Sequence, residues 1–267
     1  MRLPFFYRLH RAFFGLREVL YPPVCSVCGD ALEEKGALCP ECLGEYRRAR
    51  LFDCGRCGRQ LDSCTCSSDL LEKAGVRRMI KLFRYFPGHE RSAESQIIFA
   101  LKHKNLETLF HFMGKELADT LLSLVPIESK ADYIVTYVPR TPHEERKNGY
   151  DHARLLSLAF SAESGIPFER CLLRSNRRAM EQKRMETYAE RIKNVKDAFC
   201  LDAKCKIDGK RVILIDDIVT TGATVSECAK ILRRQGGAKE VIIASLALVP
   251  HNINPLFENE KKCGKNR

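Results

Sequence analysis

The sequence predicts an α/β protein in which a small, cysteine-rich, metal-binding module precedes a parallel β-sheet. Two observations lead to this prediction. Eight of the 13 cysteines cluster in the first quarter of the 267-residue chain, and short β-branched runs then alternate with helix-compatible segments. Such alternation is typical of a parallel sheet with helices on its faces. The 45% hydrophobic content is sufficient for such a core and excludes a mainly disordered chain.

Residues 1–21 are expected to form an N-terminal amphipathic helix. Apolar side chains recur at steps of three or four residues, and Pro22 and Pro23 end the pattern. Charges interrupt this segment every few residues, so it lacks the continuous apolar region of a secretory signal. No uncharged apolar run in the chain reaches the roughly 20 residues that a membrane-spanning helix needs. We therefore expect a cytoplasmic protein without a transmembrane segment, whose first helix packs on the rest of the chain in preference to a membrane surface.

Residues 22–68 are predicted to form a double zinc ribbon. Two cysteines separated by two residues can bind one tetrahedral ion, and two such pairs complete a shell of four thiolates. Because this shell leaves no position for water, we expect the zinc to be structural and not catalytic. The predicted ligands are Cys25, Cys28, Cys39 and Cys42 in the first set, and Cys54, Cys57, Cys64 and Cys66 in the second.

The cysteine spacing leaves several points open. It does not decide whether the two sets bind in sequence or interleave, or whether one or two ions bind. A disulfide framework is the alternative, which a reducing compartment disfavours. The other five cysteines have no paired spacing and are expected to be ordinary core or surface thiols: Cys171, Cys200, Cys205, Cys228 and Cys263.

Residues 74–250 are predicted to form the sheet domain, followed by a polar, basic tail at residues 251–267. In parallel sheets, ligands bind outside the carboxyl ends of the strands, so the loops that follow the strands are the places to expect a site. Apolar periodicity predicts a helix at residues 97–122, and β-branched runs predict strands at residues 133–138, 212–215 and 241–248.

The loop after residue 215 carries the most specific pattern. Asp216 and Asp217 end a buried strand, and their carboxylates can accept hydrogen bonds from sugar hydroxyls. The backbone amides and threonine hydroxyls that follow converge on a helix N-terminus, which favours phosphate. The pattern predicts a ribose-phosphate site, with an ordinary acidic strand end and N-cap as the alternative. The predicted phosphate-binding residues are Val219, Thr220, Thr221, Gly222, Ala223 and Thr224.

Basic residues mark two further segments. Arg140 and Arg146 follow the strand at residues 133–138, where they are expected to hold a pyrophosphate, with an exposed basic loop as the alternative. Residues 170–196 hold nine Lys or Arg against three acidic residues, which is typical of a solvated face but also suits a basic lid or a strand-binding surface. The net charge of +11 favours polyanionic partners, either nucleic acid or a heavily phosphorylated small molecule.

Two resemblances follow from these motifs. Residues 212–224 resemble the motif with which type I phosphoribosyltransferases bind 5-phosphoribosyl-1-pyrophosphate (PRPP). Over almost its full length the chain resembles the ComF family, also called the GntX-like or double-zinc-ribbon phosphoribosyltransferase family. The matching segments, in order, are residues 20–29, Val138-Pro139 with Gly149-Tyr150-Asp151, Gln182 with Arg191, Asn194 and Ala198-Phe199, and residues 212–224.

The family resemblance implies a set of functional expectations. It implies that Asp216 and Asp217 act as the catalytic residues that contact the ribose hydroxyls, and that PRPP binds together with Mg²⁺. It also implies a cytoplasmic bacterial protein that acts in natural competence and transformation by handling incoming single-stranded DNA, with a competence helicase and recombination mediators as partners. The chain departs from the family at Asp151-His152, where Asn-Gln is frequent, and this departure concerns the pyrophosphate contacts.

Three functions are therefore compatible with the sequence. The first is a competence protein that binds PRPP and single-stranded DNA. The second is a phosphoribosyltransferase of nucleotide salvage or biosynthesis; 6-oxopurine acceptors are disfavoured because Thr220 stands where such enzymes place an acidic general base. The third is a non-catalytic, zinc-bearing adaptor on a phosphoribosyltransferase scaffold. Whether the chain turns over a substrate is left open.

Overall fold

The computed structural model describes residues 23–87, 92–104, 106–141, 145–146, 149–174 and 198–249. Several expectations lie outside the described residues: the N-terminal helix at residues 1–21, most of the basic stretch at residues 170–196, and the tail at residues 251–267. No helix within the described ranges is both long enough and apolar enough to cross a membrane.

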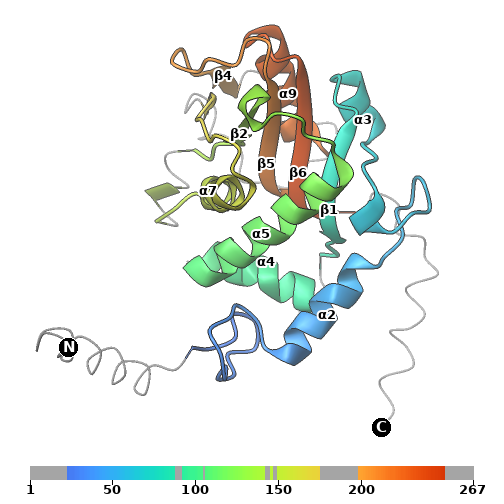
Figure 1. The fold of residues 1–267 in the computed structure, drawn as a ribbon, viewed down its shortest axis with the longest axis vertical. Coiled ribbons are helices and arrows are strands. Elements are labelled where there is room, and N and C mark those ends of the chain that lie inside the picture. Colours follow the sequence, from blue (N-terminus) through green and yellow to red (C-terminus); the bar gives the residue numbers. More distant parts are fainter. Residues whose placement is uncertain are drawn as a thin grey trace, which may run out of the picture.

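A four-stranded, fully parallel sheet forms the centre of the larger domain, with the strand order β1-β6-β5-β2 (Figure 1). The predicted parallel α/β fold is confirmed. The edge strand β1 was not predicted, because Lys81 and the flanking arginines interrupt its apolar pattern. The strands are β1 (Arg78–Arg84), β2 (Tyr133–Tyr137), β5 (Arg211–Val219) and β6 (Glu240–Leu248).

Helices cover both faces of this sheet, so alternate residues of each central strand enter different cores. In β5, Ile213 and Ile215 pack toward one group of helices, whereas Val212 and Leu214 pack toward the other. This burial on both faces explains the continuous apolar run of the strand. Figure 1 shows the first group together on one side of the sheet. That group is α4 (Ala93–His103), α5 (Glu107–Leu124) and α7 (His152–Ser164), and the second is α3 (Asp69–Lys73) and α9 (Ala223–Arg234).

The prediction of one continuous helix at residues 97–122 is wrong, because the structure has two helices there, α4 and α5. Leu106 has an extended backbone, with φ −90° and ψ 103°, and serves as the N-cap of α5. Farther along α5, Gly114 lets this helix approach α7 closely. A Cβ atom placed there would lie only 2.6 Å from the Cβ atom of Ala159.

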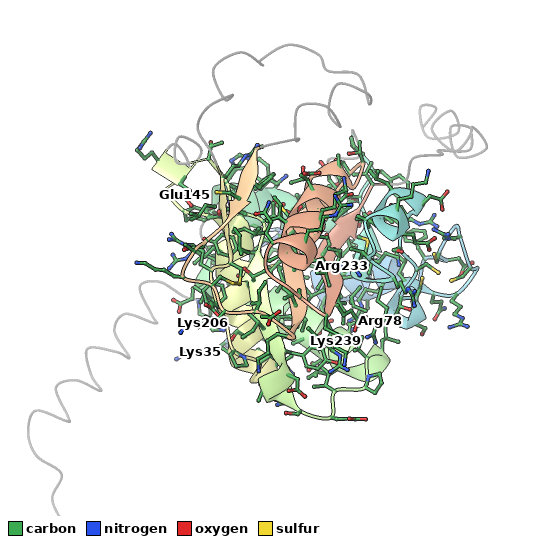
Figure 2. All side chains as sticks on the ribbon, turned by 90° about the horizontal axis from the view of Figure 1, so that it is seen from above. Lys35, Arg78, Glu145, Lys206, Arg233 and Lys239 are labelled. Atoms are coloured by element: carbon green, nitrogen blue, oxygen red, sulfur yellow. A yellow bond between two sulfur atoms is a disulfide. The ribbon has the colours of Figure 1, made fainter. Side chains whose placement is uncertain are left out.

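Both edges of the described sheet are paired with short segments outside it. At the β1 edge, the Met79 amide donates to the Thr65 carbonyl (2.9 Å). At the β2 edge, Val135 forms an isolated parallel bridge with Phe168, and its amide donates to the Pro167 carbonyl (2.8 Å). The Arg78–Glu240 ion pair (2.8 Å) marks the amino ends of β1 and β6, where Figure 2 also labels Lys239.

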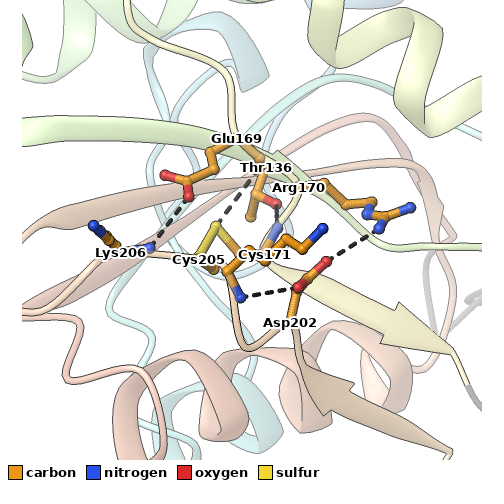
Figure 3. Close-up of a disulfide and its surroundings, with 8 residues drawn as sticks. Thr136, Glu169, Arg170, Cys171, Asp202, Cys205 and Lys206 are labelled. Carbon is orange, nitrogen blue, oxygen red and sulfur yellow. Dashed lines mark hydrogen bonds and ion pairs between the residues drawn. A yellow bond between two sulfur atoms is a disulfide. The ribbon is translucent and has the colours of Figure 1, made fainter.

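A second, two-stranded antiparallel sheet, β3 (Leu172–Arg174) with β4 (Phe199–Leu201), packs against the core on the α3 and α9 side of the central sheet. Cys171, just before β3, forms a disulfide with Cys205 (Figure 3). The expectation that these two cysteines are unpaired thiols is therefore wrong. They are 34 residues apart in the sequence, and the fold brings them together by anchoring the Cys171 amide to Thr136 Oγ1 of β2 (3.1 Å).

The N-terminal module packs against the sheet domain through α2 (Pro40–Arg50). Tyr46 is fully buried there, and its hydroxyl donates to Glu116 Oε2 of α5 (3.0 Å). Arg50 also pairs with Glu116 and donates to Thr120 Oγ1 (2.7 Å). A short helix, η1 (Leu61–Ser63), lies between the second pair of cysteine knuckles.

Candidate functional site

The two predicted carboxylates lie at the carboxyl end of β5, which is longer than predicted and continues to Val219. Their backbones are held locally, because the Asp217 amide donates to Asp216 Oδ1 (3.0 Å) and the Ile218 amide donates to Asp217 Oδ1 (2.9 Å). Ser245 of β6 donates from Oγ to the Asp217 carbonyl (3.3 Å). Hydrogen bonds to the next strand and within β5 therefore fix the position of this acidic pair.

The loop after β5 turns directly into α9. Gly222 is the N-cap of α9 and has φ +79°, a conformation that glycine adopts without strain. Thr221 Oγ1 accepts a hydrogen bond from the Ala223 amide (3.2 Å), and Thr220 is exposed. The partial positive charge of a helix N-terminus therefore lies just beyond the two carboxylates, in an arrangement that suits a phosphate ester of a sugar.

Two cations face Asp217. Arg140 Nη2 lies 3.0 Å from Asp217 Oδ2, and Lys102 Nζ lies 3.9 Å from the same oxygen. The Asp217 and Arg140 side chains are only 12% and 23% exposed, so this ion pair is largely shielded from water. Arg140 was predicted. Lys102 was missed, because its role depends on where the end of α4 lies and no sequence motif marks it.

Arg146 behaves differently from Arg140. It is exposed, and among the described residues it is not a partner of Asp217. The structure therefore brings only one of the two predicted arginines to the acidic pair.

Asp151 and His152, where the chain departs from the family pattern, support the Arg140 loop and α4. Asp151 is the N-cap of α7, and its Oδ2 accepts a hydrogen bond from the Arg140 amide (3.0 Å). His152 is buried, and its Nε2 lies 3.1 Å from the Lys102 carbonyl. These two residues thus position the backbone of both cations that face Asp217.

Burial shifts the pKa of three groups at this site. The pKa of Asp216 is raised well above its ordinary value by desolvation and by the neighbouring carboxylate of Asp217. Desolvation also raises the pKa of Asp151. Desolvation, together with the positive charge of Arg140, lowers the pKa of His152 to about 4, so its imidazole is neutral at neutral pH.

The eight N-terminal cysteines form two groups in sequence order, and they do not interleave. Within each set, the sulfur atoms all lie within 4.8 Å of one another. The Cys28–Cys39 and Cys57–Cys64 sulfur distances are 3.7 and 3.5 Å. Zn–S bonds of about 2.3 Å in a tetrahedron require sulfurs about 3.8 Å apart. Both clusters therefore fit a structural zinc ion. A third group, Glu169 with Cys171 and Cys205, has both of its sulfurs in the disulfide.

Two protein families match separate parts of the chain. A family described as "Double zinc ribbon domain" matches residues 16–71, which include all eight clustered cysteines. A family described as "Phosphoribosyl transferase domain" matches residues 157–266, which include β5, the loop and α9.

Several curated proteins are similar to most of the chain. "DNA utilization protein YhgH" of Shigella flexneri is 26% identical over 225 residues, covering 80% of this chain and 86% of that protein. "Competence protein F" of Haemophilus influenzae is 27% identical over 233 residues, covering 84% and 96%. Among solved structures, adenine phosphoribosyltransferase from Leishmania tarentolae is 18% identical and covers 59% of this chain and 63% of its own, with a TM-score of 0.33. That structural similarity is too low to support an argument about function.

Proposed function

On the premise that this chain is a distant homologue of the ComF family, we propose that it binds PRPP with Mg²⁺ in the loop after β5 and binds single-stranded DNA during competence. The premise rests on the match to a double zinc ribbon followed by a phosphoribosyltransferase domain. The zinc ribbons are structural parts of this protein. The PRPP site and the DNA-binding surface serve its function.

The observation that most supports the PRPP proposal is the position of the acidic pair beside a helix N-terminus. Asp216 and Asp217 accept hydrogen bonds from the ribose hydroxyls, and the backbone amides of the loop that ends at Gly222 hold the 5-phosphate. Arg140, whose guanidinium already lies against Asp217, extends positive charge toward the pyrophosphate. Mg²⁺ neutralises part of the pyrophosphate charge when it is bound.

The Arg140–Asp217 pair also explains how the site tolerates two adjacent carboxylates before PRPP binds. Without a nearby cation, both carboxylates would repel a phosphorylated ligand. Arg140 and Lys102 offset this repulsion at Asp217, while the raised pKa of Asp216 favours its neutral form. The described site is therefore electrostatically suited to an anionic sugar phosphate.

The DNA proposal is supported by the charge of the chain and by the names of its relatives. A net charge of +11 attracts polyanions, and the two relatives are described as a DNA utilization protein and a competence protein. Binding to phosphates releases counterions, so the affinity for a single strand should fall steeply with salt.

Calorimetric titration of PRPP with Mg²⁺ tests the first proposal. We expect saturable binding to the wild type, and a loss of roughly tenfold or more in Asp216→Asn/Asp217→Asn, the scale of one charge-assisted hydrogen bond. The matched control is Asp132→Asn/Asp208→Asn, which removes two exposed carboxylates that precede β2 and β5 at the opposite end of the sheet. Wild-type protein that binds no PRPP would favour the adaptor alternative.

A single-stranded oligonucleotide titrated at several salt concentrations tests the second proposal. The same titrations with PRPP present show whether the two ligands influence each other. Measurement of released pyrophosphate in the same samples reports turnover separately from binding. An affinity for the oligonucleotide that does not change with salt would contradict contact with the phosphate backbone.

A further inference from the structure

Lys81 is a buried lysine in the middle of β1. The residue is only 1% exposed, and its side chain points toward the second cysteine cluster. An ammonium group removed from water is costly unless its charge and its three N–H donors are compensated. The partners of Lys81 Nζ therefore indicate why the residue is a lysine.

Most of the described partners of Lys81 Nζ belong to the second zinc-ligand set. The ammonium lies 3.2 Å from Cys64 Sγ, 3.5 Å from the Cys64 carbonyl and 3.0 Å from the Cys66 carbonyl. Its other described partner is the Met79 carbonyl of its own strand (3.5 Å). Among these contacts the only group that can carry a negative charge is the Cys64 sulfur, as a thiolate.

A zinc ion bound by four thiolates has a net charge of −2, so a buried site of this kind favours a nearby cation. Hydrogen bonds to the ligating atoms also orient the ligands and tune the affinity for the metal. The first cluster has a different basic neighbour, because Lys104 Nζ lies 3.5 Å from the backbone carbonyl of Ser26 and not from a sulfur. The two clusters can therefore be compared within one chain.

We propose that Lys81 is a positioning residue of the second zinc site, where its ammonium donates to the Cys64 thiolate, offsets one negative charge of the zinc–thiolate centre and joins that centre to the central sheet. This proposal does not depend on PRPP or DNA binding. It concerns an interaction between the two domains that spacing of the cysteines does not reveal.

The chain around Lys81 connects the same zinc site to the sheet by backbone contacts. The Met79 amide donates to the Thr65 carbonyl (2.9 Å), and Cys66 forms an isolated bridge with Arg78. Two residues after Cys66, the Ser68 hydroxyl is near the loop after β5. It would lie 3.6 Å from a Cβ atom placed on Gly222. Because Thr65 and Cys66 pair with β1, loss of zinc from the second site should weaken the hydrogen bonds at the β1 edge.

Zinc release to a chromogenic chelator tests the role of the charge. In Lys81→Met, which keeps most of the side-chain volume but removes the ammonium, we expect the affinity of the second site for zinc to fall about 10- to 100-fold. The first site should keep its wild-type affinity. Cys28→Ser and Cys57→Ser assign the two release phases, because these are exposed and equivalent ligands of the first and second sites. Lys104→Met is the matched control lysine and should not change release from the second site.

Thermal unfolding separates this role from simple packing. If Lys81 acts on the zinc centre, Lys81→Met lowers the unfolding temperature of the zinc-loaded protein but not that of the chelator-treated protein. Equal losses in both forms, or unchanged zinc affinity at the second site, would overturn the proposal.

Hydrogen exchange keeps the proposal testable if Lys81→Met does not fold. In Cys57→Ser, we expect faster exchange of the Met79 amide, because its acceptor, the Thr65 carbonyl, lies between the predicted zinc ligands Cys64 and Cys66. Cys28→Ser should leave that amide unchanged. Equal protection of the Met79 amide in the two variants would show that the second site is not joined to β1 and would refute the inference.

Discussion

Replacement of Arg140 by methionine should weaken PRPP binding much more than the same replacement of Arg146. Both arginines belong to the loop region after β2, but only Arg140 lies against the acidic pair, 3.0 Å from Asp217 Oδ2. The partly buried contact between these two side chains indicates a low-dielectric position, in which one charge-assisted hydrogen bond contributes about 1.5–3 kcal/mol. If Arg140 makes one such contact with the pyrophosphate, Arg140→Met should lower the affinity about 10- to 150-fold.

Arg146 provides the control for this measurement. It is exposed, and exposed charges contribute about 0–1 kcal/mol, so Arg146→Met should change the affinity by no more than about fivefold. Both variants lose one positive charge, which removes the effect of net charge from the comparison. Calorimetric titration of PRPP with Mg²⁺ at one fixed salt concentration measures the two values. Equal losses in the two variants, or an unchanged affinity in Arg140→Met, would refute the reasoning about Arg140.

Two further predictions concern stability. The pKa of His152 is about 4 in the folded protein and about 6.5 in the unfolded chain. Between these pH values only the unfolded chain binds a proton at this residue. The free energy of unfolding therefore falls as the pH falls from about 6.5 to 4, by up to about 3 kcal/mol. His152→Gln should lose this part of the pH dependence, measured by urea unfolding at pH 7 and pH 4.5; an unchanged difference between the two pH values would contradict it. The Cys171–Cys205 disulfide closes a separation of 34 residues, which corresponds to about 4 kcal/mol of unfolded-state entropy. Cys171→Ser/Cys205→Ser should therefore unfold at lower urea concentration than the oxidised wild type, whereas Cys200→Ser, which replaces an exposed free cysteine, should not.

Local patterns in the sequence were sufficient to predict which candidate residues lie together. The spacing of the cysteines predicted both four-cysteine clusters, because each knuckle is formed by neighbours in the chain. The apolar run that ends at Asp216 and Asp217 predicted β5 and the loop to Gly222 for the same reason. The positive φ at Gly222 is consistent with the requirement for glycine at that turn.

Features that depend on contacts between distant segments could not be predicted. Lys81 made β1 look too polar for a strand, because its partner is a cysteine cluster supplied by another part of the chain. Lys102 reaches Asp217 only because α4 ends beside β5. Cys171 and Cys205 carry no spacing signal, and the disulfide follows from the pairing of β3 with β4, which lie far apart in the sequence.

The pairing at the two edges of the sheet has a consequence for self-association. An edge strand with free N–H and C=O groups can pair with the same strand of another molecule, which is a common route to aggregation. Here Thr65 covers part of the β1 edge and Phe168 covers part of the β2 edge. A shortened chain that begins at residue 74 would expose the β1 edge, and we expect it to aggregate at concentrations at which the full chain remains dispersed. The N-terminal zinc-ribbon segment should therefore also prevent the β1 edge from pairing with another molecule.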